Sequence, residues 1–457
     1  MSGYITGGSR TQATFFPEVL DDFISEENTV RVLDIIVDEL NLSELGFQRA
    51  KPSHTGRPSY DPATMLKLYL YGYLNRIQSS RRLEREAQRN IELMWLTRRL
   101  APDFKTIADF RKDNSKGIKN ACRTFIDICR KLGMFKDAVV AVDGSKFKAV
   151  NNKSKNYTPS KLKFHIERVE KHIQEYLNKL DTADNDEFSE SKETISQKID
   201  ALKSTLEEFK ELKKKVEAAP DKQISETDPD SRLMKVKGMI RQVSYNIQSA
   251  VDTKHHLIVA HKVTNETDHG KLDEMGRMSQ EALQHKELTV IADKGYYSAL
   301  DIKNALDEGM DVLVPKTDTS GSDKKGIFNR SMFKYDREKD VYICPANKEL
   351  TYRMSGIERG MTLKRYFLDT KTCRDCELKP SYTKSSHNRR IARWENENIL
   401  EDMQKRLIAQ PDTMLIRKQT VEHPFGTIKM WMGSTHFLTK RFKNVSTLRR
   451  FSHNLWH

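Results

Sequence analysis

The amino-acid sequence predicts an α/β protein. An all-helical domain precedes its α/β core, and two insertions interrupt that core. Three observations lead to this prediction. Helical patterning dominates residues 15–135, and apolar strand-like runs surround Asp143 and Asp293. A long heptad pattern separates these two runs, so the strands that they predict belong to one domain split by an insertion.

Residues 1–14 are interpreted as a flexible leader, and residues 15–135 as a helical N-terminal DNA-binding domain. Asp61 followed by Pro62 predicts a helix start, because an N-cap acceptor precedes a proline at the first helical position. Short helices rich in arginine favour a helix-turn-helix-like module that contacts DNA. The alternative is a plain helical bundle with a solvated charged face. The candidate contacts are Arg81, Arg82 and Arg85.

The predicted core comes in three parts, residues 136–157, 236–317 and 396–457. The first part is a strand, and the second reads as a hairpin, a helix, a strand, a helix and a strand. The third part supplies a C-terminal helix. This order of elements is that of a ribonuclease-H-like core.

Two insertions separate these parts. Within residues 158–235, apolar positions repeat at steps of 4 and 3 on both sides of a polar turn, which predicts an antiparallel coiled helical hairpin. We interpret it as an interaction or spacer arm without catalytic residues. Residues 318–395 are a polar insertion that carries three of the five cysteines.

Composition points to a polyanionic partner. The chain has 457 residues, with 79 Lys+Arg against 65 Asp+Glu and a net charge of +14. Such an excess favours nucleic acid, an anionic membrane surface or an acidic protein. No apolar run has the roughly 18–20 residues of a membrane span, and the N-terminus lacks the apolar core of a secretory signal. An odd number of cysteines argues against a disulfide framework. We therefore expect a cytoplasmic protein with no membrane contact.

Three acidic residues stand out as a candidate phosphoryl-transfer site. Asp143 lies within VVAVDGSKFKAV, Asp293 ends LTVIAD, and Glu422 lies in the cation-rich helical stretch RKQTVEHPFGTIKMW. Carboxylates that converge from different elements suit hard divalent cations, which prefer oxygen ligands. Asp252 and Asp268 are competing candidates, but their positions favour a turn residue and a helix cap respectively.

These residues together resemble the DDE transposases of bacterial insertion sequences, within the IS4/IS5-like superfamily and closest to the IS1182-type group. VDGSKFKA, IADKGYYS and VEHPFGTIK are similar to the family's three catalytic blocks, and GRPSYDPATMLKLYLYGYL to its helical N-terminal domain. Glu422 and Lys429 reproduce the family's E-x6-K spacing. The resemblance covers most of the chain and implies a ribonuclease-H-like catalytic fold.

The resemblance also implies a mechanism and partners. Asp143, Asp293 and Glu422 would bind two Mg²⁺ or Mn²⁺ ions. The enzyme would cleave DNA strands at the terminal inverted repeats with water, then join the freed 3′-OH to target DNA. Arg417, Lys418 and Lys429 would contact DNA phosphates. The protein would act in a bacterial cytoplasm, associated with the nucleoid when bound to DNA, and a homodimer would hold two element ends.

Two further features give weaker hypotheses. Trp431 is a candidate for stacking on an unpaired base, against the alternative of a packing role. Cys344 with the CxxC pair Cys373 and Cys376 resembles part of a zinc ribbon. No fourth cysteine follows closely, so we favour a metal-free remnant of such a ribbon over a bound Zn²⁺.

Two other functions fit the same sequence. One is a DDE-like nuclease that cuts DNA without integrating it. The other is a non-catalytic DNA-binding protein derived from a transposase. The basic composition fits all three functions, so the choice of an active transposase depends on the three acidic residues.

Overall fold

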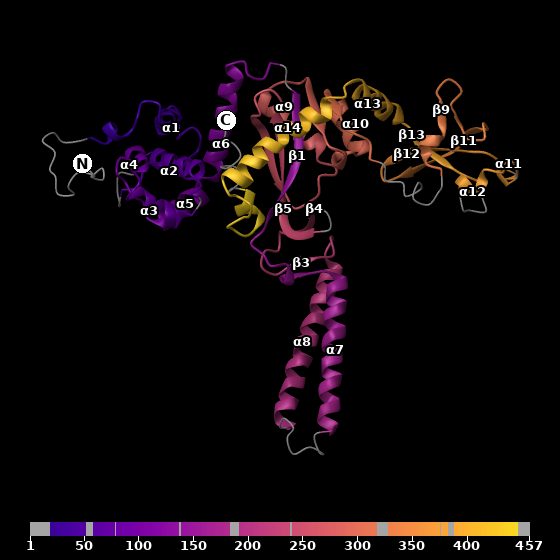
Figure 1. Ribbon diagram of the computed structural model, residues 1–457, viewed down its shortest axis with the longest axis horizontal. Coiled ribbons are helices and arrows are strands. Elements are labelled where there is room, and N and C mark those ends of the chain that lie inside the picture. Colours follow the sequence, from indigo (N-terminus) through magenta and orange to yellow (C-terminus); the bar gives the residue numbers. More distant parts are fainter. Residues whose placement is uncertain are drawn as a thin grey trace, which may run out of the picture.

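The computed structural model describes residues 19–51, 58–77, 79–136, 139–182, 192–237, 240–317, 328–374, 376–382 and 388–446. A central sheet lies in the middle, with a helical domain on one side and a smaller, mostly β domain on the other (Figure 1). A pair of long helices projects from the base of the sheet (Figure 1). The leader, residues 1–14, lies outside the described residues.

The central sheet has six strands in the order β4-β5-β1-β7-β8, with β6 also paired to β5. β1 pairs antiparallel with β5 and parallel with β7, and β7 pairs parallel with β8. An antiparallel half joined to a parallel half is consistent with the predicted ribonuclease-H-like fold. The strands are β1 (Val139–Lys148), β4 (Arg232–Lys237), β5 (Ile240–Asp252), β6 (Ile258–Thr264), β7 (Leu288–Ala292) and β8 (Met310–Leu313).

Helices cover both faces of this sheet. On one face, α9 and α10 bury Met275 and Ile302 against Val142 and Val290. On the other face, α14 buries Val421 against Ala141 and its neighbours. The alternation of side chains along β1 explains this division, because odd and even positions of a strand point to opposite faces. The helices are α9 (Leu272–Leu283), α10 (Ala299–Asp307), α13 (Glu397–Ala409) and α14 (Thr413–Gly426), and α14 continues as η6 (Thr427–Trp431).

The N-terminal domain is helical in its described residues. Its centre is α2, which is buried along most of its length, and the side chain of Asp61 caps it by accepting the Ala63 N–H at 2.8 Å. This confirms the helix start predicted from Asp61 and Pro62. The helices are α1 (Thr29–Asp38), α2 (Pro62–Leu74), α3 (Ser80–Ala87), α4 (Ile91–Leu96), α5 (Phe104–Asp113) and α6 (Ser115–Lys131), preceded by η1 (Leu20–Phe23).

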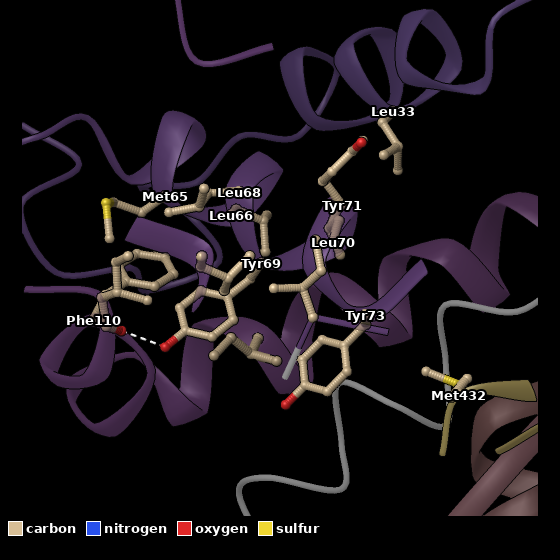
Figure 2. Packing of buried hydrophobic residues seen from close by; sticks show 14 of the residues in the cluster. Leu33, Met65, Leu66, Leu68, Tyr69, Leu70, Tyr71, Tyr73, Phe110 and Met432 are labelled. Carbon is tan, nitrogen blue, oxygen red and sulfur yellow. Dashed lines mark hydrogen bonds between the residues drawn. The ribbon is translucent and has the colours of Figure 1, made fainter. Parts of the chain in front are cut away.

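One hydrophobic cluster joins the N-terminal domain to the core. Tyr69 and Phe110 stack within the domain, with ring centroids 5.8 Å apart. Met432, at the end of η6, belongs to the same cluster and lies on the side of Tyr73 (Figure 2). Phe147 of β1 and Phe425 of α14 belong to it as well. Shared packing of this kind fixes the helical domain next to the C-terminal half of β1.

The projecting pair consists of α7 (Pro159–Thr182) and α8 (Lys192–Ala218), which pack against each other along the arm (Figure 1). The short strands β2 (Asn156–Tyr157) and β3 (Ile224–Ser225) pair at its base, after η2 (Lys153–Lys155). The helices end earlier than the predicted boundary at residue 235. Residues 232–237 instead form β4, because their backbone pairs with the long strand β5.

The cysteine-bearing segment forms its own five-stranded sheet, in the order β13-β12-β11-β10-β9. The sequence did not lead us to predict these strands. Trp394, in the last of them, packs into the main core and so ties this domain to α13. The elements are η5 (Arg330–Met332), β9 (Lys334–Asp336), β10 (Val341–Ile343), β11 (Glu349–Glu358), β12 (Met361–Phe367), α11 (Thr370–Arg374), α12 (Lys379–Tyr382) and β13 (Ile391–Trp394). Among the helices described, none is long and apolar enough to cross a membrane.

Candidate active site

Asp143 and Asp293 lie side by side at one edge of the central sheet. β1 and β7 are parallel, and Val142 is in register with Ala292. The residues that follow them, Asp143 and Asp293, are therefore at the same level of the sheet. Asp293 leaves the strand and caps η3 (Lys294–Tyr296), where its Oδ1 accepts the Gly295 N–H at 2.8 Å. The carboxyl ends of parallel strands are where α/β sheets place their functional groups.

Arg417 of α14 reaches both carboxylates. Its Nη2 lies 2.8 Å from Oδ1 of Asp143 and 4.0 Å from Oδ2 of Asp293. The Arg417 side chain is only 13% exposed and Asp143 is partly buried with it, whereas Asp293 is 44% exposed and open to solvent. The two carboxylates therefore share one neighbouring positive charge, that of the Arg417 guanidinium.

Burial raises the pKa of Asp143 to about 6. The Arg417 guanidinium opposes this rise, and the negative charge of Asp293 adds to it. The raised pKa means that the surroundings stabilise the charged carboxylate less well than water does, mainly because the group is buried. Such a site favours a further cation.

Asp268 lies directly behind the strand that carries Asp143. Its Oδ1 accepts hydrogen bonds from Asn246 and Gln248, both at 2.8 Å, and its Oδ2 pairs with Lys146 at 2.6 Å. A Cβ atom on Gly144 would lie 1.9 Å from this same Oδ1. Gly144 is thus required for Asp268 to approach β1.

The position of Asp268 differs from the prediction of a helix cap. α9 begins after Lys271, which has no capping side chain, and Asp268 accepts hydrogen bonds from β5 instead.

Tyr296, fully buried, donates a hydrogen bond to Gln248 and so connects η3 to this network. Burial and the nearby acids raise the pKa of Tyr296 well above its usual value, which keeps it a neutral donor. Asp252 behaves as predicted: it accepts the backbone N–H groups of the β5–β6 turn.

Glu422 lies on α14 but does not contact the aspartate pair. It is exposed, and it lies five residues after Arg417, which places it about 140° around the helix from that side chain. Within the described residues, no group of three His, Cys, Asp or Glu side chains is arranged to hold a metal ion. The structure thus brings together two of the three predicted carboxylates.

Helical spacing nevertheless places Glu422 on the flank nearest the second half of β1. Lys418, Glu422, Phe425 and Lys429 follow one another at steps of 4, 3 and 4, so they share a side of the helix. Phe425 packs near Phe147, with ring centroids 6.3 Å apart. Lys429 donates to Ser145 Oγ at 2.6 Å and to the Lys146 carbonyl at 3.2 Å.

The other predicted DNA-binding residues fall into two places. Of the adjacent cations on α14, Arg417 faces the carboxylates and Lys418 is exposed. Trp431 is 65% exposed, with the guanidinium of Arg76 from the N-terminal domain 5.5 Å from its ring centroid. The arginines of α3 lie exposed in the N-terminal domain, away from the acidic pair. These are Arg81, Arg82 and Arg85.

The three candidate zinc ligands lie in the cysteine-bearing domain, where Cys344 belongs to a small hydrophobic cluster and Cys376 packs against it. Cys344 and Cys373 are buried, and Cys376 is partly buried. Burial raises the pKa of the Cys373 thiol, and the neighbouring Cys344 and Cys376 sulfurs add to the rise. The three sulfurs are therefore near one another, and zinc binding by them stays a prediction.

Sequence reasoning missed the polar residues of β5 that support the site. Asn246, Gln248 and Ser249 are fully buried within β5, where they lie among apolar residues. Buried amides need partners, and polar residues inside a buried strand were the available signal. The salt bridge from Arg417 to Asp143 was also missed, because sequence spacing alone does not give the rotation of α14.

The donor set of this site fits a divalent cation. Two carboxylates lie within reach of one positive charge, and the guanidinium occupies a position between them where a metal ion would receive the same oxygen donors. A sheet consistent with a ribonuclease-H-like fold, with adjacent acidic residues at this end of its strands, suits metal-dependent chemistry on phosphates.

Comparison with known protein families gives the more specific class. Residues 18–113 match the model of a transposase domain (DUF772), and residues 221–451, half of the chain, match that of the transposase DDE domain. The chain belongs to the DDE transposase family, whose members act on DNA and generally use divalent metal ions such as Mg²⁺. No curated protein and no solved structure matched the chain. Membership of the IS1182-type group stays a prediction.

Proposed function

We propose that this protein binds the ends of an insertion sequence, cleaves DNA strands there by metal-dependent hydrolysis, and joins the 3′-OH ends to target DNA. The observation that supports this most directly is the adjacency of Asp143 and Asp293 around Arg417 at the sheet edge. Membership of the DDE transposase family supports the type of reaction. The positions of Asp143, Asp293 and Arg417 support the choice of residues.

Asp143 and Asp293 would hold the metal ions, with Glu422 as the third ligand. Two Mg²⁺ or Mn²⁺ ions would activate the attacking oxygen and stabilise the leaving oxygen of an in-line displacement. Glu422 is exposed on α14, the helix that also carries Arg417, and in this proposal it would turn toward the aspartate pair when metal binds.

Arg417 has two tasks in this proposal. In the free protein it neutralises part of the charge of the aspartate pair. With the charge of the aspartates neutralised by bound metal, its planar guanidinium would be free to bind a phosphate through two parallel hydrogen bonds. Lys418 and Lys429 would hold the neighbouring phosphates, since backbone phosphates position DNA without reading its sequence.

The experiment that tests this function is cleavage of labelled DNA that carries the two ends of the protein's own element, with Mg²⁺ or Mn²⁺. Wild type should nick at the ends, and Asp143→Asn and Glu422→Gln should abolish nicking while DNA binding is retained. Glu349→Gln, in the cysteine-bearing domain and paired with Lys339, is the matched control and should cleave normally. Nicking that survives Glu422→Gln would remove this glutamate from the metal site.

The same reaction products separate the two alternatives. A nuclease without integration activity would give nicked DNA and no joined products. A domesticated DNA-binding protein would bind the ends tightly and release no nicked strand in any metal. The presence of both aspartates in one site favours an active enzyme over this last alternative.

A homodimer on DNA is part of the same proposal. Transposition needs two element ends in one complex, and the arm formed by α7 and α8 offers an interface that projects from the core (Figure 1). Light scattering should show a mass of two chains when end DNA is present. Monomers both with and without DNA would contradict this assembly.

A further inference from the structure

Two neighbouring hollows lie along the second half of β1, beyond the acidic pair. Their volumes are about 760 and 550 Å³. Lys148, Asn151 and Gln242 line both hollows, so together they form one groove. We call it the β1 groove.

The β1 groove begins next to the candidate active site. Lys429, which lines its first part, donates to Ser145, two residues after Asp143. Its second part is lined by Lys153, in η2 at the base of the projecting arm. The groove thus leads from the acidic pair along the surface toward the arm.

Positive charge follows this groove along its whole length. Among the described residues that line it, there is no carboxylate. Lys148, Lys153 and Arg241 are exposed, and no ion pair joins them to an acid in the part of the chain that the structure describes. The lining cations are Lys146, Lys148, Lys153, Arg241 and Lys429. Of these, Lys146 is paired with Asp268 and Lys429 is hydrogen-bonded to Ser145, so Lys148, Lys153 and Arg241 carry the charge that a polyanion would meet in this concave surface.

A second observation points to a ligand in the same place. Both polar atoms of the Asn151 side chain are buried, and neither has a hydrogen-bond partner among the described residues. Asn151 lines the groove where its two parts meet. Leaving a buried amide without partners is unfavourable, so such groups normally bind a ligand or ordered water. An amide can donate to a phosphate oxygen with little rearrangement.

The distance along β1 from Asp143 to Lys148, a residue that lines both hollows, matches a stretch of DNA backbone. From Asp143 to Lys148 the strand advances five residues, which is roughly 17 Å at the usual rise of a β-strand. That length equals the axial length of about five base pairs of B-DNA. Several successive phosphates of one strand would therefore lie along the cations.

We propose that the β1 groove binds the phosphate backbone of the DNA strand that leaves the active site, over about five nucleotides on the side toward the projecting arm. This inference rests on the proposed function, since it takes DNA as the substrate held at Asp143. It adds the path of the strand and the residues that hold it. Lys148 and Arg241 are the central phosphate contacts, and Asn151 adds a neutral donor where the two hollows meet.

The test measures DNA affinity against salt concentration, in EDTA so that no cleavage occurs, with a labelled 30-base-pair duplex of arbitrary sequence. The test variant is Lys148→Gln with Arg241→Gln. The matched control is Lys339→Gln with Lys405→Gln, which removes the same charge from exposed lysines elsewhere. Each lost phosphate contact lowers the slope of log K against log salt by about 0.9, so the test variant should lose about 1.8 and the control almost nothing.

A charge-preserving variant guards against a folding defect. Lys148→Arg with Arg241→Lys should restore the wild-type slope, because both positions stay cationic. An unchanged slope in the Gln variant, or an equal loss in the control, would overturn the groove as a binding site. Wild-type nicking in Mg²⁺ is scored separately: nicking together with an unchanged slope would refute the groove alone, whereas a lowered slope without any nicking would refute the proposed reaction alone.

Discussion

Nη2 of Arg417 lies 2.8 Å from Oδ1 of Asp143, closer than to any oxygen of Asp293, whose Oδ2 is 4.0 Å away. The arginine is therefore paired with Asp143 of β1 and lies farther from Asp293, the residue that follows β7. Its guanidinium occupies the side of Asp143 that faces the second carboxylate. A metal ion shared by the two aspartates would have to displace this contact, and Arg417 therefore competes with the metal in the free protein.

We expect Arg417→Gln to bind Mn²⁺ more tightly than wild type, by roughly threefold to tenfold, because the competing cation is gone. A tenfold change corresponds to about 1.4 kcal/mol, well within the strength of a partly buried charge pair. DNA cleavage by the same variant should fall, since a phosphate ligand is lost as well. Titration of Mn²⁺ followed by electron paramagnetic resonance measures the first effect directly.

Arg406→Gln provides the control for this experiment. Arg406 also pairs with an aspartate, Asp311, but at the surface and away from the site. Its substitution should leave Mn²⁺ affinity and cleavage unchanged. Weaker Mn²⁺ binding in Arg417→Gln would mean that the arginine supports the metal ligands instead of competing with the ion.

The pKa of Asp143 predicts a pH-dependent stability. A carboxyl group whose pKa is raised from 3.8 to about 6 binds its proton more tightly in the folded chain than in the unfolded chain. Its stabilising contribution is complete below pH 3.8 and is lost as the pH rises through 6. The difference amounts to about 3 kcal/mol at most.

Asp143→Asn removes this titration while keeping the size of the side chain. Without metal, the variant should unfold at a higher temperature than wild type at pH 7.5, and the difference should shrink toward zero near pH 4. Thermal unfolding in EDTA across this range measures both. A difference that stays constant with pH would show that Asp143 does not titrate as its burial predicts.

The sequence predicted the parts of the fold that follow from strong periodic signals. The 4-and-3 spacing of apolar residues gave the helical arm, and the apolar runs before Asp143 and Asp293 gave β1 and β7. Asp61 and Pro62 marked the start of α2 because capping is a local effect. The sequence placed Asp143 within one strand and Asp293 at the end of another, and the parallel register of β1 and β7 brings the two together.

Other features depend on contacts between distant residues and left little local signal. β11 is exposed at most of its positions, so it lacks the alternation that identifies a half-buried strand. The role of Asp268 depends on the space above Gly144, which only the packing of β5 against β1 reveals. Likewise, the choice between Arg417 and Lys418 depends on the rotation of α14 about its axis.

Trp431 is expected to link the N-terminal domain to the core. The guanidinium of Arg76 lies over its ring, and contacts of this kind contribute about 0.5–1 kcal/mol at exposed sites. Trp431→Ala and Arg76→Ala should each lower the melting temperature slightly, and the double variant should lose less than the sum of the two. A purely additive loss would show that the two side chains do not interact in solution.

Gly144→Ala should be one of the most damaging small substitutions in the protein. Its new methyl group would lie 1.9 Å from Oδ1 of Asp268 and 2.5 Å from Nε2 of Gln248, and both atoms are held in the network behind the active site. Forcing such a group into a packed site costs about 1–3 kcal/mol, and it also moves the strand that carries Asp143. Cleavage should therefore fall more than stability alone explains.

Gly356→Ala is the matched control, because a Cβ atom there meets nothing within 4 Å, and it should keep wild-type stability and cleavage. If Gly144→Ala melted and cleaved like Gly356→Ala, Asp268 would not be fixed against β1 as the structure has it.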